Sequence, residues 1–183
     1  TAAMRALGLP SIVVNRRLLF SGAPRGPVAE AAPQDMMRLA VMLAMGQLVS
    51  PKASRDMRAI MVRQRHHDQF PRYMNLLPYA EDNEQPRLLR VLNKTGSNGG
   101  LRADVGVVQV GDAPLLAFSV VSDTGPDETY CSEHPAAVIN GLVGRVLLEY
   151  WWPGEWQPER AVTPSPYVDA LLAEAGVSRR MQT

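Results

Sequence analysis

Residues 88–122 read LLRVLNKTGSNGGLRADVGVVQVGDAPLLAFSVVS, and this stretch decides the fold. It holds three extended segments rich in branched apolar residues, which we predict to be strands: Leu88 to Ser97, Ala103 to Val110 and Leu115 to Ser122. The four residues Gly111 to Pro114 are typical of a hairpin connection between the second and third segments. Alternation of apolar and polar residues is weak in the third segment, which predicts that helices cover both of its faces.

Helices are predicted on both sides of these strands in the chain. One begins at Pro33 and continues to Leu48 with little polar surface, so we expect it to be buried. A second follows Ser50 and Pro51, a good pair for the N-cap and the first turn, and should be half exposed. A third is capped by Ser132, and its apolar stripe is expected to pack on the sheet: Ile139, Leu142, Val143, Val146, Leu147 and Tyr150.

This order of helices, strands and a covering helix predicts an α+β fold around an antiparallel sheet. We expect residues 1–152 to form one domain or part of one, and residues 153–183 to form a tail in which residues 167–175 can make a short helix. Residues 2–8 favour a helix that ends at Gly8, and the Pro- and Gly-rich residues 10–33 are expected to be a long loop.

The net charge, the lengths of the apolar runs and the cysteine count exclude several classes of partner and site. The 183 residues carry a net charge of only +1 and have a pI near 7.9, so neither nucleic acid nor an anionic membrane is expected as a partner. The longest apolar runs, such as Leu115 to Phe118, fall far short of the roughly 20 residues that span a bilayer. The single cysteine, Cys131, excludes an internal disulfide and a multi-cysteine zinc site, and it leaves the redox compartment open.

The sharpest chemical signal is Lys94-Thr95-Gly96-Ser97 at the end of the first predicted strand. On a strand, Thr95 and Ser97 project to one face and Lys94 to the other, so two hydroxyl donors line a groove with an ammonium beneath it. Gly96 lets a ligand approach the backbone, and the Ser97 N–H, if unpaired at this edge, can form half of an oxyanion hole. This pattern predicts binding of a small molecule that bears a carboxylate. The alternative is a strand end with ordinary surface hydroxyls.

The run from Asn93 to Val108, with its glycine turn, resembles the C-terminal part of the serine β-lactamase and penicillin-binding-protein superfamily, above all class A β-lactamases and their serine-hydrolase relatives. The predicted helix from Pro33, the corner from Gly46 to Pro51 and the helix ending at residues 150–152 resemble that family in order and spacing. The resemblance therefore covers residues 1–152. It implies a β-lactamase/transpeptidase-like fold without a cofactor, and a secreted or periplasmic location.

The resemblance also implies an activity and a set of roles. The activity is acyl-serine chemistry on amide or ester substrates that bear a carboxylate. Lys94 and Ser97 would be catalytic, Lys94 through its charge and Ser97 through its amide, which would bind the oxyanion. Thr95, Gly96 and Ser97 would bind the substrate, the two hydroxyls holding its carboxylate.

Two further motifs of that family are missing from the sequence. Its nucleophilic serine is followed three residues later by a lysine, and a second element has the form S-x-N. No serine of this chain has lysine at that position, and Tyr73-Met74-Asn75, a variant of the second element, lies too close before Lys94 and is read as chance. We expect both elements in a preceding segment, so that this chain is the C-terminal part of a split or truncated enzyme. Alone it would be inactive, and it would associate with that segment or with itself.

The residues from Asn15 to Leu19 occupy the region where class A β-lactamases carry a glutamate for deacylation, and they hold no acid. The only acid before Pro33 is Glu30, which leaves the deacylating base open. Two other functions stay open as well. One is an autoproteolytic hydrolase with Thr1 as its nucleophile, and the other is a non-catalytic carboxylate-binding domain.

Two further groups have ordinary structural interpretations. His66-His67-Asp68 is interpreted as a solvated helix end rather than a metal site, because adjacent helical residues point about 100° apart. Asp104 is expected to accept hydrogen bonds from backbone amides near Lys94 to Ser97 rather than to act as a base.

Overall fold

The computed structural model describes residues 1–16, 27–74, 76, 89–123 and 125–153. The prediction of a short helix over residues 167–175 lies outside this part of the chain, as does most of the predicted tail. The connection from residue 77 to residue 88 also lies outside it.

Three strands form one antiparallel sheet in the order β3-β4-β5. They are β3 (Leu89–Asn98), β4 (Leu101–Val110) and β5 (Leu116–Ser122). The tight turn between Asn98 and Leu101 contains Gly99 with a φ of 41°, a conformation that glycine adopts more readily than other residues. The three predicted strands and the hairpin between β4 and β5 are confirmed to within a few residues.

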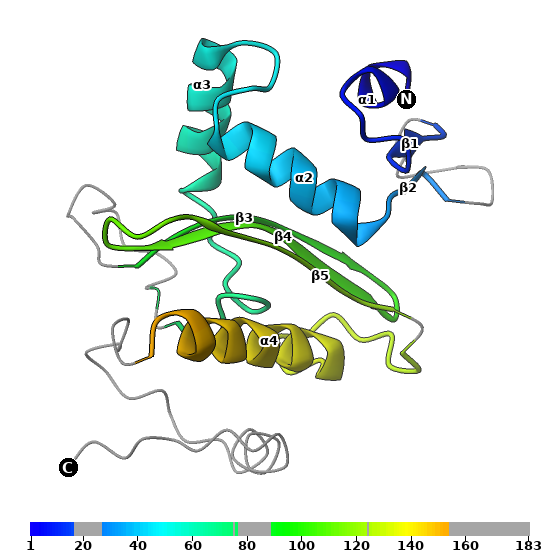
Figure 1. The fold of residues 1–183 in the computed structure, drawn as a ribbon. Helices are drawn as coiled ribbons and strands as arrows, with labels where there is room; N and C mark the ends of the chain where they lie inside the picture. Colours follow the sequence, from blue (N-terminus) through cyan, green and yellow to red (C-terminus); the bar gives the residue numbers. More distant parts are fainter. Residues whose placement is uncertain (17–26, 75, 77–88, 124, 154–183) are drawn as a thin grey trace.

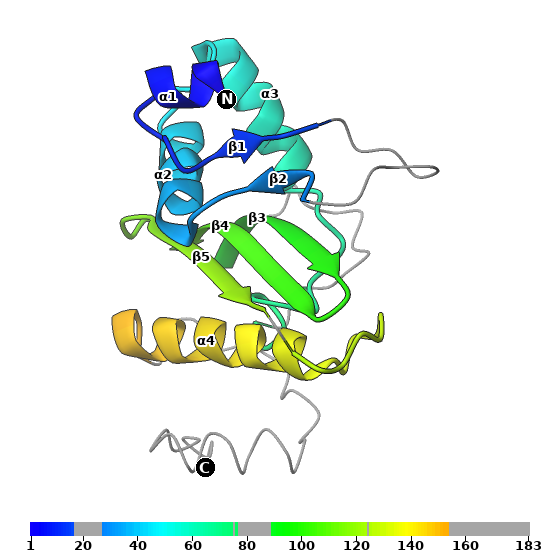
Figure 2. The same cartoon turned by 90° about the vertical axis from the view of Figure 1, so that its right-hand side faces the viewer.

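Helices cover both faces of this sheet (Figures 1 and 2). On one face lies α2 (Pro33–Ala44), followed along the chain by α3 (Pro51–Met61), and on the other lies α4 (Pro135–Trp151). Both α2 and α4 contact β4 and β5. The α+β class with a helix-covered antiparallel sheet is therefore confirmed.

The apolar core lies between the sheet and α4 and includes Phe70 and Met74 from the segment of residues 69–74. Phe70 of that segment stacks on Phe118 of β5. The remaining buried members come from the strands, from that segment and from α4: Met74, Leu89, Val91, Val108, Val110, Leu148 and Trp152.

The N-terminal region contains more structure than its composition predicts. After α1 (Ala2–Ala6), β1 (Val13–Val14) pairs antiparallel with β2 (Ala29–Glu30). Our prediction of an uninterrupted loop over residues 10–33 is wrong in this respect, because two-residue strands are too short to produce a periodic pattern.

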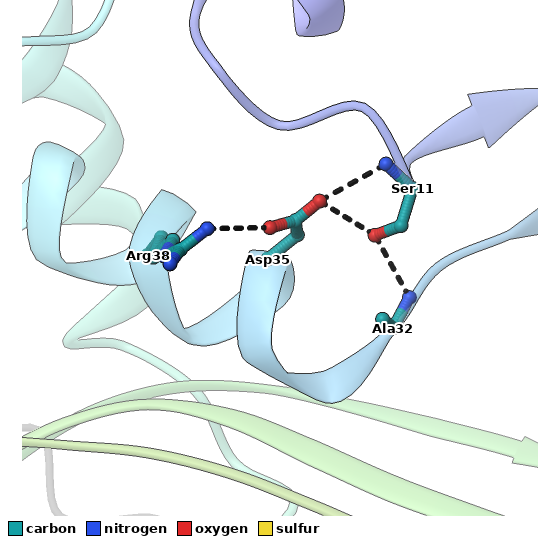
Figure 3. A network of polar contacts seen from close by, with 4 residues as sticks. All are labelled: Ser11, Ala32, Asp35 and Arg38. Atoms are coloured by element: carbon teal, nitrogen blue, oxygen red, sulfur yellow. Dashed lines mark hydrogen bonds and ion pairs between the residues drawn. The ribbon is translucent and has the colours of Figure 1, made fainter.

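A buried carboxylate joins this region to α2 (Figure 3). Asp35 accepts hydrogen bonds from the Ser11 backbone N–H at 3.0 Å and from the Ser11 hydroxyl at 2.7 Å, and it pairs with Arg38 at 3.2 Å. The Ser11 hydroxyl oxygen in turn accepts the Ala32 N–H at 3.1 Å. The start of α2 is thereby tied to the loop before β1.

The predicted helix from Pro33 to Leu48 is shorter and less buried than expected. It ends at Ala44, its C-cap is Met45, and one face remains open, with Val41 40% and Met45 63% exposed. The helix begun by Ser50 and Pro51 is confirmed, and the Ser50 hydroxyl accepts the Ala53 N–H at 3.1 Å.

The helix α4 packs on the sheet as predicted, and Leu147 of the predicted stripe lies against the core, but most of that stripe is not the buried face. Ile139 is 46% and Tyr150 74% exposed, and Val143 and Val146 are partly exposed as well. The buried face instead carries mostly small residues: Ala136, Ala137, Val138, Asn140, Gly141, Gly144 and Leu148. Ser132 does not cap the helix, because the N-cap is His134, whose ring accepts the Ala136 N–H at 3.1 Å.

The two glycines of α4 explain this orientation. A Cβ at Gly144 would lie 2.1 Å from the Phe70 carbonyl oxygen, and one at Gly141 would lie 2.7 Å from the Arg72 Cβ. The helix therefore packs directly on the backbone of residues 69–72, which larger side chains would prevent. Among the described helices, none is long and apolar enough to cross a membrane.

Candidate functional site

The end of β3 brings Lys94, Thr95, Gly96 and Ser97 together as consecutive strand residues. Within the described part of the chain, β3 pairs with β4 alone, so one edge of the strand has no neighbouring strand. Lys94 and Ser97 are exposed, and Thr95 and Gly96 are half-buried. All four candidate residues therefore lie on a strand that has a free edge within the part of the chain that the structure describes.

The two faces of β3 contact different parts of the molecule. Leu89 and Val91 pack with the α4 cluster, and the same alternation places Thr95 and Ser97 on that side. Leu92 contacts the side that bears α2 and α3, and Lys94 shares this face. The Lys94 ammonium donates to the Thr95 carbonyl, which holds its charge beside the strand.

The turn after the candidate site is fastened by Arg102 and Tyr130. Arg102 is 2% exposed and donates to the Gly99 carbonyl at 2.8 Å, to the Leu101 carbonyl at 2.7 Å and to the Thr129 carbonyl. Its guanidinium lies 5.3 Å from the centre of the Tyr130 ring, and the Tyr130 hydroxyl accepts the Gly99 N–H at 3.0 Å. The loop before α4 therefore holds the turn between β3 and β4, which directly follows the candidate site.

Gln69 contacts the candidate site from the side of the sheet that faces α4, and no pattern in the sequence predicts this role. This side chain is only 1% exposed, and its Nε2 donates to the Gly96 carbonyl at 3.2 Å and to the Ser97 hydroxyl oxygen at 3.4 Å. Its Oε1 accepts from Asn140 of α4 at 3.0 Å. Gln69 belongs to no motif in the sequence, and only its buried hydrogen bonds identify it.

Asp104 lies next to Thr95 in the strand register and is 1% exposed. Its carboxylate accepts the Phe70 backbone N–H at 3.1 Å and the Asn93 side-chain amide at 3.0 Å. Burial raises the pKa of Asp104 to about 7, although these hydrogen bonds act in the opposite direction. Asp104 therefore accepts from a backbone amide as predicted, but that amide belongs to Phe70 and not to residues 94–97.

The other candidate groups form no site. Residues His66 to Asp68 lie beyond the end of α3, and the described residues include no group of three or more His, Cys, Asp or Glu side chains able to hold a metal ion. Cys131 is exposed as a free thiol. The Thr1 hydroxyl oxygen accepts the Val14 N–H at 3.1 Å, and the hydroxyl donates to the Val14 carbonyl oxygen at 3.3 Å, so this group is engaged with the backbone of β1.

In chemical terms the strand end offers an ammonium and two hydroxyls within four residues. Charge-assisted hydrogen bonds from such groups are the ones that hold carboxylates most strongly. The candidate site therefore suits a small anion.

A family model described as the beta-lactamase enzyme family matches residues 1–151. Among solved structures, the chain is similar to a β-lactamase from Sphaerobacter thermophilus DSM 20745, with 21% identity and a TM-score of 0.64; the match covers 81% of this chain and 51% of the other. It is also similar to PBP-A, with 18% identity, a TM-score of 0.61 and coverage of 82% and 49%.

A β-lactamase from Streptomyces albus G gives 20% identity, a TM-score of 0.59 and coverage of 80% and 51%. The chain thus spans about half the length of these solved structures. Comparison with curated proteins gives no significant match.

Proposed function

Because the chain belongs to the beta-lactamase enzyme family, we propose that it is the substrate-recognising portion of a β-lactamase-like serine hydrolase. The substrate class is an amide or ester that bears a carboxylate. The reaction is acyl transfer to a serine followed by hydrolysis, and the 183 residues do not include that serine, since no S-x-x-K is present in them.

The roles of this chain follow from the strand end. Lys94 supplies positive charge, and the hydroxyls of Thr95 and Ser97 donate to the substrate carboxylate. Gly96 has no side chain to block the approach of the substrate to the backbone. The Ser97 N–H contributes one donor to the oxyanion hole.

One observation carries the proposal: Lys94 and Ser97 are exposed at an open strand edge whose underside is occupied by buried Gln69. Burying a polar side chain costs free energy unless its hydrogen bonds are satisfied. A strand end with ordinary surface hydroxyls does not require a buried glutamine side chain that donates to it. The absence of S-x-x-K from the sequence favours, as the second candidate, a domain that binds carboxylates without catalysis.

Titration of the 183-residue chain with phenylacetate, followed by the backbone amide signals in NMR, tests the proposed site. Saturable shifts at residues 94–97 are expected. Thr95→Val should raise the dissociation constant about tenfold or more, because it removes a charge-assisted hydrogen bond worth roughly 1.5 to 3 kcal/mol. Lys94→Gln should also raise the dissociation constant, because it removes the positive charge beside the strand.

Lys52→Gln is the matched control for Lys94→Gln. Lys52 is the other lysine of the chain, it pairs with Asp56 on α3, and its side chain is 79% exposed. Its replacement should leave the dissociation constant within about twofold, since exposed charges at a distance are screened by salt. Equal affinities of the wild-type and Thr95→Val proteins, or shifts that avoid residues 94–97, would mean that the strand end is purely structural.

A further inference from the structure

We propose that Gln69 is a positioning residue for this site: its buried amide holds the Ser97 hydroxyl as an acceptor, which leaves the hydroxyl proton to donate to a ligand carboxylate. The inference rests on the proposed function, because it concerns the same strand end. It assigns a role to a residue outside the Lys94–Ser97 motif, and it explains what orients the proton of the Ser97 hydroxyl.

Backbone carbonyls fix the orientation of the side-chain amides of Asn140 and Gln69, which are hydrogen-bonded to each other. Asn140 is fully buried, and its Nδ2 lies 3.3 Å from the Arg102 carbonyl oxygen, which can only accept. The same Nδ2 lies 3.0 Å from Gln69 Oε1, while Asn140 Oδ1 receives the Ser122 hydroxyl at 2.8 Å. At the other end, Gln69 Nε2 faces the Gly96 carbonyl oxygen, which also can only accept.

These contacts leave a single assignment for the protons of Gln69. A primary amide carries two N–H donors. One is directed to the Gly96 carbonyl at 3.2 Å, and the other is directed to the Ser97 hydroxyl oxygen at 3.4 Å. Rotation of the amide by 180° would place oxygen against a carbonyl oxygen, a repulsive contact in a buried position.

The Ser97 hydroxyl therefore accepts from beneath. A hydroxyl has one proton, and Gln69 Nε2 has no lone pair available to receive it. The proton is directed away from Gln69, and Ser97 is exposed to solvent. This arrangement prepares the hydroxyl to donate to an anion before the ligand arrives, which lowers the ordering cost of binding.

The first test is a double-mutant cycle with phenylacetate as the probe. Gln69→Met keeps the length of the side chain and removes both donors without adding charge. In the wild-type background it should raise the dissociation constant about threefold to tenfold, the range expected for one neutral hydrogen bond. In the Ser97→Ala background the same change should have an effect below about 1.5-fold, because the coupling needs the hydroxyl. Gln34→Met, at an exposed position of α2, is the matched control and should change nothing.

The second test needs no ligand. The two Nε2 proton signals of Gln69 are observed in the wild-type and Ser97→Ala proteins. One signal should move toward the position of a free amide, and the other, bonded to Gly96, should stay. This measurement decides whether Gln69 donates to the Ser97 hydroxyl, even where Gln69→Met does not fold or where the wild-type protein binds no carboxylate. In the latter case the proposed function fails and the hydrogen-bond assignment is judged separately.

Two results would overturn the inference. One is an equal loss of affinity for Gln69→Met in both backgrounds, since a residue that only supports the fold weakens binding whether or not Ser97 has a hydroxyl. The other is the absence of any response of the Gln69 Nε2 protons to Ser97→Ala.

Discussion

At the scale of single residues, two buried carboxylates have opposite surroundings. Burial raises the pKa of Asp104 to about 7, and the charge of Asp68 adds to the increase. The hydrogen bonds from the Asn93 side chain and from backbone N–H groups lower this pKa but do not offset burial. The hydrogen bonds from Ser11 lower the pKa of Asp35, and Arg38 lowers it further. The two groups should therefore shape the dependence of stability on pH in opposite directions.

The folded protein holds the Asp104 proton more tightly than the unfolded chain does. Its contribution to stability is full below about pH 4, the usual carboxyl range, and is lost as the pH rises through about 7. Asp104→Asn should remove this loss and make the protein more stable than wild type at pH 8, by roughly 1 to 3 kcal/mol. Urea unfolding of both proteins from pH 4 to pH 8 measures the effect. Parallel stability curves would show that Asp104 does not titrate in this range.

Asp35 gives the reverse dependence. Because its folded-state pKa lies below the usual value, its contribution is present above about pH 4 and is lost as the pH falls through the folded pKa. Asp35→Asn should lower the melting temperature at pH 7, and the difference from wild type should shrink at acidic pH. Thermal unfolding at several pH values tests this, with Asp56→Asn as an exposed control that should have little effect. A difference that does not change with pH would contradict the account.

Residues of the candidate site could be predicted only where they belong to a sequence pattern, such as a strand that ends in a glycine turn. Lys94 to Ser97 and the role of Asp104 could be found because their neighbours in the sequence already describe a strand end. Gln69 could not be found, because its partners are 27 and 71 residues away in the sequence and a lone glutamine carries no spacing signal.

At the scale of elements, α4 shows that residue size can outweigh hydrophobicity in deciding which face of a helix packs. Its larger apolar side chains, such as Ile139, suggested one buried stripe, yet the face with Gly141 and Gly144 lies against residues 69–72. Periodicity reports where apolar residues recur, and it does not report where another backbone approaches closely. The boundaries of the strands were predictable because branched residues and turn glycines agree there.

Gly144→Ala tests this packing. In an exposed helix the change would stabilise by up to about 1 kcal/mol, since alanine is the better helix former. Here the new Cβ would lie 2.1 Å from the Phe70 carbonyl oxygen, so the helix or residues 69–72 must move. We expect a loss of roughly 1 to 3 kcal/mol, as for other overpacked positions.

Chemical denaturation of the Gly144→Ala and Ile139→Ala proteins measures the comparison. Ile139 is 46% exposed on α4, so its truncation should cost less than the added methyl group at Gly144. If Gly144→Ala proved neutral or stabilising, the close approach of α4 to residue 70 would be wrong.

At the scale of the whole molecule, the α+β class and the layer order followed from the order of helices and strands along the chain. The pairing of β1 with β2 did not, because Val13 pairs with Glu30 across a long connection and each strand has only two residues. The match of the beta-lactamase enzyme family over residues 1–151 fits the sheet and its helices. The chain spans about half of the solved structures it resembles.

The central claim is that this chain recognises a carboxylate at Lys94 to Ser97 without forming a bond to it. Titration of the 183-residue protein with benzylpenicillin, followed through its backbone amide signals in NMR, tests both halves at once. We predict saturable shifts centred on residues 94–97 that reverse when the ligand is removed by dialysis. The claim would be contradicted by shifts that avoid these residues, or by a second set of signals that persists after dialysis and so reports a covalent adduct.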